Sequence, residues 1–298
     1  MLRLSWILLF LVGVPSAGAK GQKSHEHEVE RAGVKLTLFE KWTPGDESKW
    51  RQNGKVVLLV HGATWSSRCT FDTADDYSLM DDLAAAGYDV FAIDLHGYGK
   101  SGKTERDWTE AETAAEDLDA AADYIRAFRW IEKIHLLGYQ WGAQAVGLFA
   151  NKHPKKVAKL ALFGMRYRQA ERKAEPAEQY RRNTPETAML RPEDGDLDPA
   201  FVRRRAQICA AADPQSPNGA LRDLTQRSAV RPEAIKQPTL LIMGDREGDT
   251  VPDRVQFFQE LASAHKWFVV LPGLGKLAPI ERGRAKFTSA LIAFFEQP

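Results

Sequence analysis

Short, almost continuously apolar runs recur along most of the chain and are separated by amphipathic segments. Runs without polar interruption are typical of β-strands buried on both faces of a sheet. An earlier alternating segment, Val34–Trp42, predicts a further strand near the N-terminus. The buried strands are predicted at Val56–Val60, Asp89–Leu95, Ile134–Leu137, Val157–Phe163, Thr239–Gly244 and Lys266–Leu271.

Helical periodicity fills the gaps between these runs. The predicted helices cover residues 76–86, 110–128, 141–152, 253–264 and 279–295. Strands that alternate with helices predict an α/β fold with a mostly parallel sheet, wound with helices on both faces.

The alternation stops after Gly164 and resumes at Thr239. Between them, Met165 to Lys236 is rich in Arg, Glu and Ala and is interrupted repeatedly by proline. This composition predicts short helices joined by turns.

The N-terminus has a different character. Arg3 precedes an apolar stretch from Leu4 to Val14, which Pro15 and a group of small residues follow. Residues 1–19 are therefore predicted to be a secretory signal peptide that is cleaved after Ala19. The apolar stretch is shorter than the roughly twenty residues that span a bilayer, so no stable membrane anchor is expected. The mature protein is predicted to be secreted or periplasmic.

We expect residues 20–30 to form a polar lead-in to the first strand, with His25 and His27 exposed to solvent.

Composition narrows the classes of partner. The 298 residues are 44% hydrophobic and carry a formal net charge of +1, which gives no general attraction for nucleic acid or for acidic membranes. The sequence contains no Cys/His cluster with metal-ligand spacing and no nucleotide-binding glycine motif, so we expect neither a metal nor a cofactor. It gives no indication of a protein partner or of oligomeric state.

Cys69 and Cys209 are the two cysteines of the chain. An exported protein passes through an oxidising compartment, where these two residues could form one disulfide bond. Two buried free thiols are the alternative, and the sequence does not decide between them.

The pentapeptide Gly138-Tyr139-Gln140-Trp141-Gly142 lies where a predicted strand turns into a helix. In a G-x-S-x-G elbow, the glycines allow strand and helix to approach closely and the central serine presents a nucleophilic hydroxyl. Gln140 occupies the central position and has no hydroxyl, and an amide is a negligible nucleophile.

Together with three other motifs, this pentapeptide makes the chain resemble the α/β-hydrolase fold superfamily, in particular its lid-bearing esterases and lipases. The other motifs are His61-Gly62 after one strand, residues 94–101 after the next, and Gly244-Asp245 through Pro252. The resemblance extends from about Val34 to the C-terminus. It implies a sheet of about eight strands, a core divided into residues 20–164 and 237–298, and a helical lid at 165–236 after the sixth strand.

The resemblance also assigns the positions of a catalytic triad, which runs in the order nucleophile, acid, histidine. Gln140 stands at the nucleophile position and Asp249 at the acid position, with Asp245 as the less favoured alternative. Lys276 stands where the histidine is expected, and no histidine follows Leu271. A Lys276–Asp249 ion pair would keep the ammonium protonated, so no competent catalytic residue is predicted.

Backbone donors do not depend on these substitutions. The N–H groups of Trp141 and of Ala63 or Thr64 could still form an oxyanion hole that binds a carbonyl or carboxylate. Trp65 and Trp141 flank this position and either line a pocket or pack in the core. The predicted ligand-binding residues are Ala63, Thr64, Trp65 and Trp141.

The sequence therefore predicts a hydrolase homologue that has lost hydrolysis and retains a pocket for a small apolar or carbonyl ligand, or for a partner. Two alternatives stay open: an ester hydrolase of unconventional mechanism, and an inactivated form of a serine esterase that had Ser at 140 and His at 276. Arg203-Arg204-Arg205 is a basic cluster that we expect on a solvated helix face.

Overall fold

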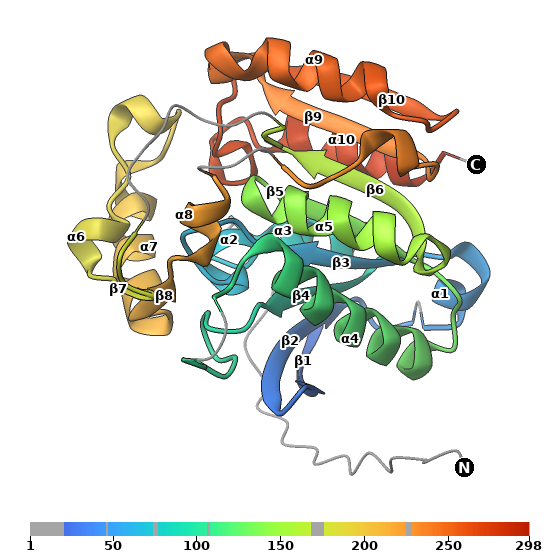
Figure 1. Cartoon of the computed structure of the whole chain (residues 1–298), viewed down its shortest axis with the longest axis horizontal. Helices are drawn as coiled ribbons and strands as arrows, with labels where there is room; N and C mark the ends of the chain where they lie inside the picture. The colour runs from blue at the N-terminus through green and yellow to red at the C-terminus, as the bar shows by residue number, and fades with distance from the viewer. Residues whose placement is uncertain are drawn as a thin grey trace.

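A computed structural model describes residues 21–45, 47–73, 77–105, 108–167, 176–224 and 228–297 (Figure 1). The predicted signal peptide lies outside the described residues. Among the helices of the described part, none combines the length and the apolar character needed to cross a membrane.

The centre of the molecule is one eight-stranded sheet with the order β1-β2-β4-β3-β5-β6-β9-β10. The three strands at one edge, β1, β2 and β4, pair antiparallel, and every neighbouring pair from β4 to β10 is parallel. The strands are β1 (Lys23–Arg31), β2 (Val34–Trp42), β3 (Val56–Val60), β4 (Asp89–Asp94), β5 (Ile134–Tyr139), β6 (Val157–Phe163), β9 (Thr239–Gly244) and β10 (Lys266–Leu271). This confirms the predicted mostly parallel sheet of about eight strands.

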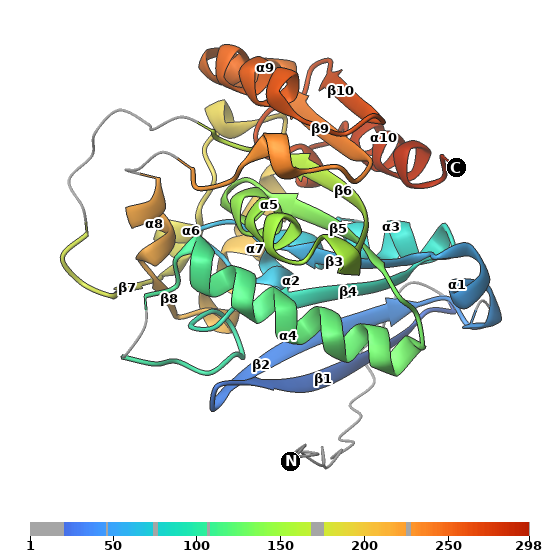
Figure 2. The same cartoon turned by 45° about the vertical axis from the view of Figure 1, so that its right-hand side comes forward.

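Helices cover both faces of the sheet, as the two views show (Figures 1 and 2). One core layer packs against α4 (Ala111–Arg129), α5 (Trp141–Lys152) and α9 (Val251–Glu260). The opposite layer packs against α3 (Leu79–Ala85) and α10 (Ala285–Phe295). Leu58 and Val60 of β3 join the first layer, whereas Val57 and Leu59 join the second. The strand is apolar without interruption because successive side chains enter different cores.

Most helix boundaries agree with the sequence pattern, but α9 ends at Glu260 and not at residue 264, and the last helix is shorter than predicted. Residues 279–295 form a 3₁₀ turn, η5 (Ala278–Ile280), and then α10. Between them Glu281 is fully buried, and its carboxylate accepts hydrogen bonds from the backbone N–H of Gly275 at 2.8 Å and of Asp196 at 3.4 Å. These contacts fix the connecting turn, so the helix begins only at Ala285.

The predicted lead-in at residues 20–30 is wrong, because most of it forms strand β1. All nine residues of β1 pair with β2. His27 is buried rather than exposed: one ring nitrogen lies 2.8 Å from Glu40 and the other 2.8 Å from the Tyr124 hydroxyl. The strand is mostly polar because it lies at the sheet edge and few of its side chains are buried. Polarity therefore hid it from the search for apolar runs.

The segment 165–236, here called the insertion, lies between the sixth and seventh strands of the central sheet. It contains short helices, as predicted, and also a two-stranded antiparallel sheet of β7 (Tyr180–Arg182) and β8 (Gln215–Pro217). Its helices are α6 (Pro185–Ala188), α7 (Pro199–Ala212) and α8 (Gly219–Asp223), with 3₁₀ turns η2 (Pro192–Asp194) and η3 (Pro232–Ala234). In Figure 1 most of it stands to the left of the sheet, beside the carboxyl ends of the parallel strands.

A buried carboxylate fastens the insertion to the core. Asp213, at the end of α7, accepts hydrogen bonds from the backbone N–H of Ser66 at 3.1 Å and of Gly99 at 3.0 Å. The hydroxyl of Ser216 donates a third bond to it at 3.0 Å. Two core loops are thus held by one side chain of the insertion.

His135 in β5 gives the folded protein a measurable dependence on pH. Burial lowers its pKa to about 3, and the nearby Lys159 ammonium acts in the same direction. The ring stacks on Phe295 at 4.8 Å between ring centroids. Because the folded state keeps this ring neutral while the unfolded chain protonates it near pH 6.5, its effect on stability is unfavourable below that pH and grows as pH falls toward 3.

We therefore expect His135→Val to weaken the loss of stability on acidification. Between pH 7 and pH 5, the unfolding free energy of the variant should fall by about 2 kcal/mol less than that of the parent. Urea unfolding of both proteins at the two pH values measures this difference. Equal changes in the two proteins would contradict a neutral, buried His135.

Candidate functional site

The turn between β5 and α5 has the backbone of a nucleophile elbow. Gln140 adopts φ 52° and ψ −112°, a conformation that residues other than glycine rarely enter. A Cβ added at Gly138 would lie 2.4 Å from the Ala143 Cα, and one at Gly142 would lie 2.3 Å from the His61 carbonyl oxygen. Both glycines are thus needed for the close approach of α5 to β5 and to the end of β3.

The Gln140 side chain at the tip of this turn is held by two hydrogen bonds. Its amide Nε2 donates to the Tyr139 hydroxyl at 3.0 Å and to the backbone carbonyl of Lys276 at 2.9 Å. The Tyr139 hydroxyl in turn donates to the same carbonyl at 2.9 Å. Burial raises the pKa of Tyr139, so its hydroxyl stays protonated. The position that holds a nucleophile in a serine hydrolase is here a neutral, hydrogen-bonded amide.

Lys276 contributes its carbonyl to this network, whereas its ammonium pairs elsewhere. Nζ lies 2.8 Å from the Asp194 carboxylate in the insertion. Burial acts to raise the pKa of Asp194, but the hydrogen bond from Lys276 and the other favourable contacts outweigh it and hold that pKa below its usual value.

The acid position is only partly described. Asp249 belongs to η4 (Asp245–Thr250), and its side chain lies outside the described residues, as does the expected Lys276–Asp249 pair. In the structure Lys276 pairs with Asp194, a residue that belongs to none of the motifs identified in the sequence. The alternative, Asp245, accepts a hydrogen bond from the Gly273 backbone at 2.8 Å and so braces two loops.

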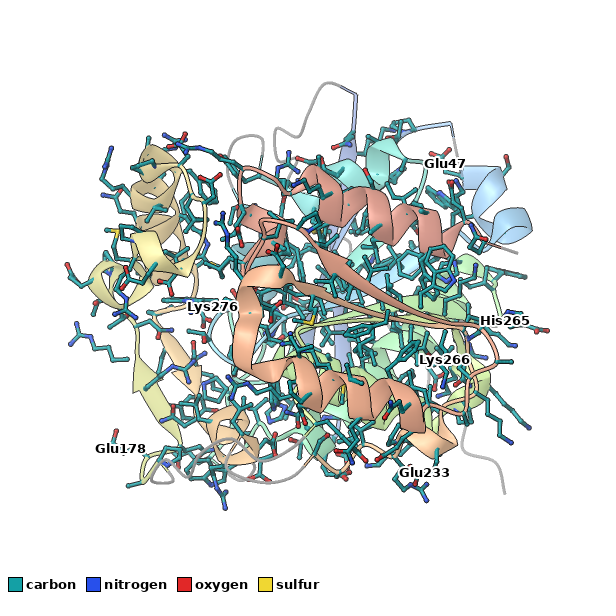
Figure 3. All side chains as sticks on the ribbon, turned by 90° about the horizontal axis from the view of Figure 1, so that it is seen from above. Glu47, Glu178, Glu233, His265, Lys266 and Lys276 are labelled. Atoms are coloured by element: carbon teal, nitrogen blue, oxygen red, sulfur yellow. The ribbon has the colours of Figure 1, made fainter. Side chains whose placement is uncertain are left out.

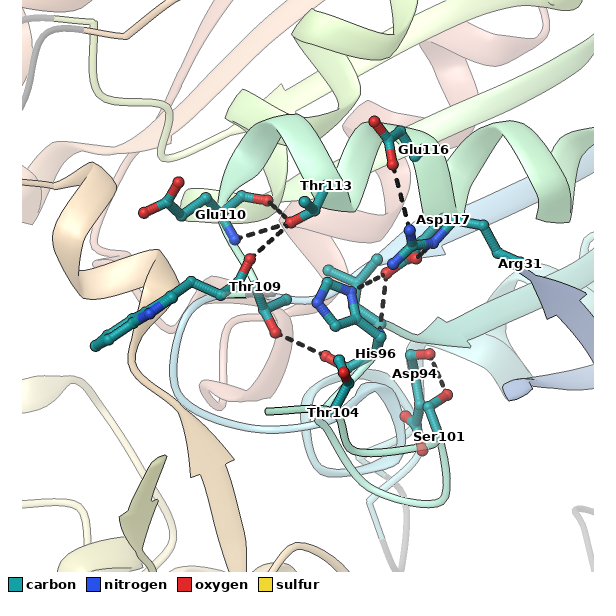
Figure 4. Close-up of polar contacts among 12 residues, drawn as sticks. Arg31, Asp94, His96, Ser101, Thr104, Thr109, Glu110, Thr113, Glu116 and Asp117 are labelled. Carbon is teal, nitrogen blue, oxygen red and sulfur yellow. Dashed lines mark hydrogen bonds and ion pairs between the residues drawn. The ribbon is translucent and has the colours of Figure 1, made fainter. Parts of the chain in front are cut away.

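The histidines near the strand ends have structural partners. His61 is fully buried and bridges two backbone groups: Nδ1 lies 2.8 Å from the Gly62 carbonyl, and Nε2 accepts from Leu95 N–H at 3.2 Å. Burial lowers its pKa to about 4. His96 pairs with Asp117 at 2.7 Å, inside the network drawn in Figure 4.

His265 lies at the opposite end of the sheet from Lys276 (Figure 3). Among the described residues, the cavity described next has no histidine in its lining.

A cavity of about 410 Å³ opens between the elbow and the insertion. Its size falls within the range of small-molecule sites. The core supplies Gly62, Ala63, Thr64, Trp65, Cys69, Thr70, Tyr139, Gln140, Lys276, Leu277, Pro279 and Ile280, and the insertion supplies Thr187, Ala188, Met189, Leu190, Arg191, Asp194 and Arg205.

The carbonyl groups of Gly62 and Ala63 fix the peptide groups that carry the N–H of Ala63 and of Thr64. The Gly62 carbonyl faces the His61 ring, and the Ala63 carbonyl accepts from the Tyr98 hydroxyl at 2.9 Å and from Arg181 at 2.8 Å. In a trans peptide the N–H points opposite to the carbonyl, so the N–H groups of Ala63 and Thr64 point away from these partners. Both residues line the cavity, where such donors could meet an anion or a carbonyl oxygen.

Trp65 and Trp141 have different locations in the structure. Trp65 lines the cavity, whereas the indole of Trp141 is buried in the core and donates to Asp223 at 2.8 Å. The side chain of Trp141 therefore takes the core-packing role of the two that the sequence left open. Its backbone N–H, at the first position of α5, has the location of an oxyanion donor.

The structure brings Cys69 and Cys209 together. Both are buried free thiols in one small cluster with Trp65, Ala188 and Ala206. The thiols share a hydrogen bond, which raises the pKa of Cys69 and lowers that of Cys209. Cys69 belongs to α2 (Ser67–Phe71) and Cys209 to α7, so the contact joins the core to the insertion.

The basic cluster on α7 is not a uniform solvated face. Arg203 and Arg204 are exposed, but Arg205 is buried and lines the cavity. An α-helix turns by 100° per residue, so the third residue of such a run can face inward. The sequence expectation was wrong for Arg205.

Among the residues that the structure describes, no group of histidine, cysteine and acidic side chains has an arrangement suited to a metal ion.

Comparisons with known proteins show the family of this chain. The family model described as serine aminopeptidase, S33, matches residues 51–275. The chain is similar to a 2-hydroxy-6-oxononadienedioate/2-hydroxy-6-oxononatrienedioate hydrolase of Escherichia coli, with 33% identity over 137 residues, covering 46% of this chain and 42% of that protein. The corresponding hydrolase of Paraburkholderia xenovorans is 30% identical over 113 residues, covering 38% of this chain and 37% of that protein. The chain thus spans less than half the length of these curated relatives.

Solved structures agree on the fold. A lipase-like protein from Sulfolobus solfataricus superposes with a TM-score of 0.68 at 17% identity, covering 96% of this chain and 98% of that one. A serine hydrolase involved in carbazole degradation superposes with a TM-score of 0.65 at 20% identity, covering 91% and 98%. With the family model spanning most of the described core, the chain belongs to the serine aminopeptidase S33 family of α/β-hydrolases.

Proposed function

We propose that this member of the hydrolase family binds a small ligand in the cavity between elbow and insertion and does not hydrolyse esters by the serine mechanism. One observation carries the proposal: the strained elbow presents the Gln140 amide, hydrogen-bonded to Tyr139 and to the Lys276 carbonyl, where a serine hydroxyl would stand. An amide neither loses a proton near neutral pH nor forms an acyl intermediate.

The general base is missing as well. The Lys276 ammonium pairs with Asp194, and the buried His61 uses both ring nitrogens on backbone groups. Loss of the nucleophile alone removes orders of magnitude of rate in serine hydrolases, and further losses add little. Most of the cavity lining comes from residues other than Gln140 and Lys276, which favours ligand binding as the retained role.

A second candidate is an ester hydrolase of unconventional mechanism. The N–H groups of Ala63 and Thr64 favour it, because oxyanion donors alone can leave a residual acceleration of about 10³ to 10⁴ over water. The curated relatives are named as hydrolases, which is consistent with this candidate.

Restoring the two side chains tests the proposal. We expect p-nitrophenyl acetate to hydrolyse no faster with the parent protein than in buffer alone. The double variant Gln140→Ser with Lys276→His should hydrolyse it at least about 10²-fold faster. Gln140→Ala with Lys276→His is the matched control, since it carries the base without a nucleophile. If the parent hydrolyses the ester well above solvent and the double revertant is no faster, the second candidate is favoured.

We further propose that the protein is exported and that Cys69 and Cys209 then form a disulfide bond. The support is the predicted signal peptide together with the thiol contact between α2 and α7. The two thiols would lose two hydrogens to a thiol oxidant of the oxidising compartment. The bond would stabilise the protein by about 2–4 kcal/mol.

Intact mass of the protein secreted by an expressing cell checks both statements. The expected mass is that of a chain that begins at Lys20, and it should rise by the mass of two hydrogens when the protein is reduced. A mass that reduction leaves unchanged would indicate two free thiols, and a retained residue 1–19 segment would contradict cleavage.

A further inference from the structure

Arg205 is a buried cation whose donors are mostly unused. Its side chain extends from α7 into the cavity wall, and the residue is 5% exposed. One donor is paired: Nη2 donates to the Cys69 carbonyl at 3.1 Å. Nε and Nη1 are buried without a hydrogen-bond partner among the described residues.

Such an arrangement is costly for a protein without a ligand. A guanidinium stays protonated at any ordinary pH, and removing it from water costs several kcal/mol unless a counter-charge and hydrogen bonds compensate. In the described part of the chain, no carboxylate lies within ion-pair distance of Arg205. Two carboxylates of the insertion, Asp194 and Asp213, are already engaged: Asp194 with Lys276, and Asp213 with backbone N–H groups of the core.

The charged residues that line the cavity are, like Arg205, mostly positive. Its described lining includes the cations Arg191, Arg205 and Lys276, with Asp194 as the one carboxylate. Asp194 is shared between Lys276 at 2.8 Å and Arg191 at 4.0 Å. The excess of positive charge favours an anion inside the cavity over a neutral or cationic ligand.

The rest of the lining defines what accompanies the anionic group. Trp65, Met189, Leu277 and Ile280 give the wall an apolar character, and Thr70 and Thr187 add hydroxyl groups. Of the five N–H donors of a guanidinium, one is used here, so an adjacent pair remains able to grip a planar carboxylate. The volume of about 410 Å³ suits a compact amphiphile.

We propose that Arg205 is the anion-binding residue of this cavity and that the ligand is a small monocarboxylate with an apolar body. This inference rests on the proposed ligand-binding function and names the chemical class of the ligand. The carboxylate occupies the unused donors of Arg205, and the apolar body lies along the wall formed by Trp65 and the leucine and isoleucine side chains.

Octanoate and octanamide form the probe pair, because they share a chain and differ in charge. We expect isothermal titration calorimetry of the mature protein to give octanoate at least tenfold tighter binding than octanamide. Arg205→Gln should remove this preference, whereas Arg203→Gln, on the exposed side of the same helix, should leave it intact.

A second readout is thermal unfolding, first without ligand and then with octanoate. Because an unpaired buried charge is destabilising, Arg205→Met should unfold at the same temperature as the parent or higher in the absence of ligand. Octanoate should then raise the midpoint of the parent and not that of Arg205→Met.

The outcomes separate the two levels of the proposal. Equal affinity for octanoate and octanamide, unchanged in Arg205→Gln, would overturn the anion inference and leave ligand binding standing. Failure of both probes to bind would overturn the inference together with the ligand-binding role. A large loss of stability in ligand-free Arg205→Met would indicate a structural role and would also overturn it.

Discussion

The left-handed backbone at Gln140 is the constraint on which the geometry of the site depends. It lets α5 start within contact distance of β5 and of the end of β3, at positions where a methyl group on Gly138 or Gly142 would overlap backbone atoms. A non-glycine residue in such a conformation costs about 1–3 kcal/mol, which the surrounding structure must offset. The two buried core layers and the hydrogen bonds of the Gln140 amide supply that support. The backbone of a nucleophile elbow is therefore present, with the Gln140 amide at its tip.

The insertion covers the elbow and so encloses the cavity, and polar contacts attach the insertion to the core. Asp213 holds two core loops, Arg181 donates to the carbonyls of Ala63 and Thr64, and Lys276 pairs with Asp194. Each contact satisfies a group that burial would otherwise penalise. Arg205 differs from them because most of its donors have no described protein partner.

Much of the fold could be predicted from the sequence because its central strands are buried on both faces. Residues 56–60, 157–163 and 239–244 were predicted with the bounds that the structure gives. The edge strand 266–271 was also predicted with its bounds, although it is only partly buried, because its apolar residues are consecutive. The mostly polar strand β1 was missed, since an edge strand with few buried side chains carries little apolar signal. The small β7–β8 sheet was missed because three-residue strands leave no periodicity to detect.

The site was predictable only where a motif fixes backbone geometry. The elbow and the loop at Ala63 lie where the motifs placed them, because glycine requirements are visible in the sequence. The sequence did not identify Asp194 as the partner of Lys276 or Arg205 as a cavity residue. A run of charged residues does not indicate which side chain a helix turns inward, or which one pairs with a distant loop. Side-chain pairing across the insertion is a tertiary property.

Labelling with a fluorophosphonate tests the central claim most directly, because the reagent reacts with activated serines irrespective of substrate preference. The mature protein, incubated with the probe and digested, should carry the phosphonyl group on no serine, while Gln140→Ser with Lys276→His should carry it on the residue at position 140. Labelling of any serine in the unaltered protein would contradict the account and reveal a nucleophile outside the elbow.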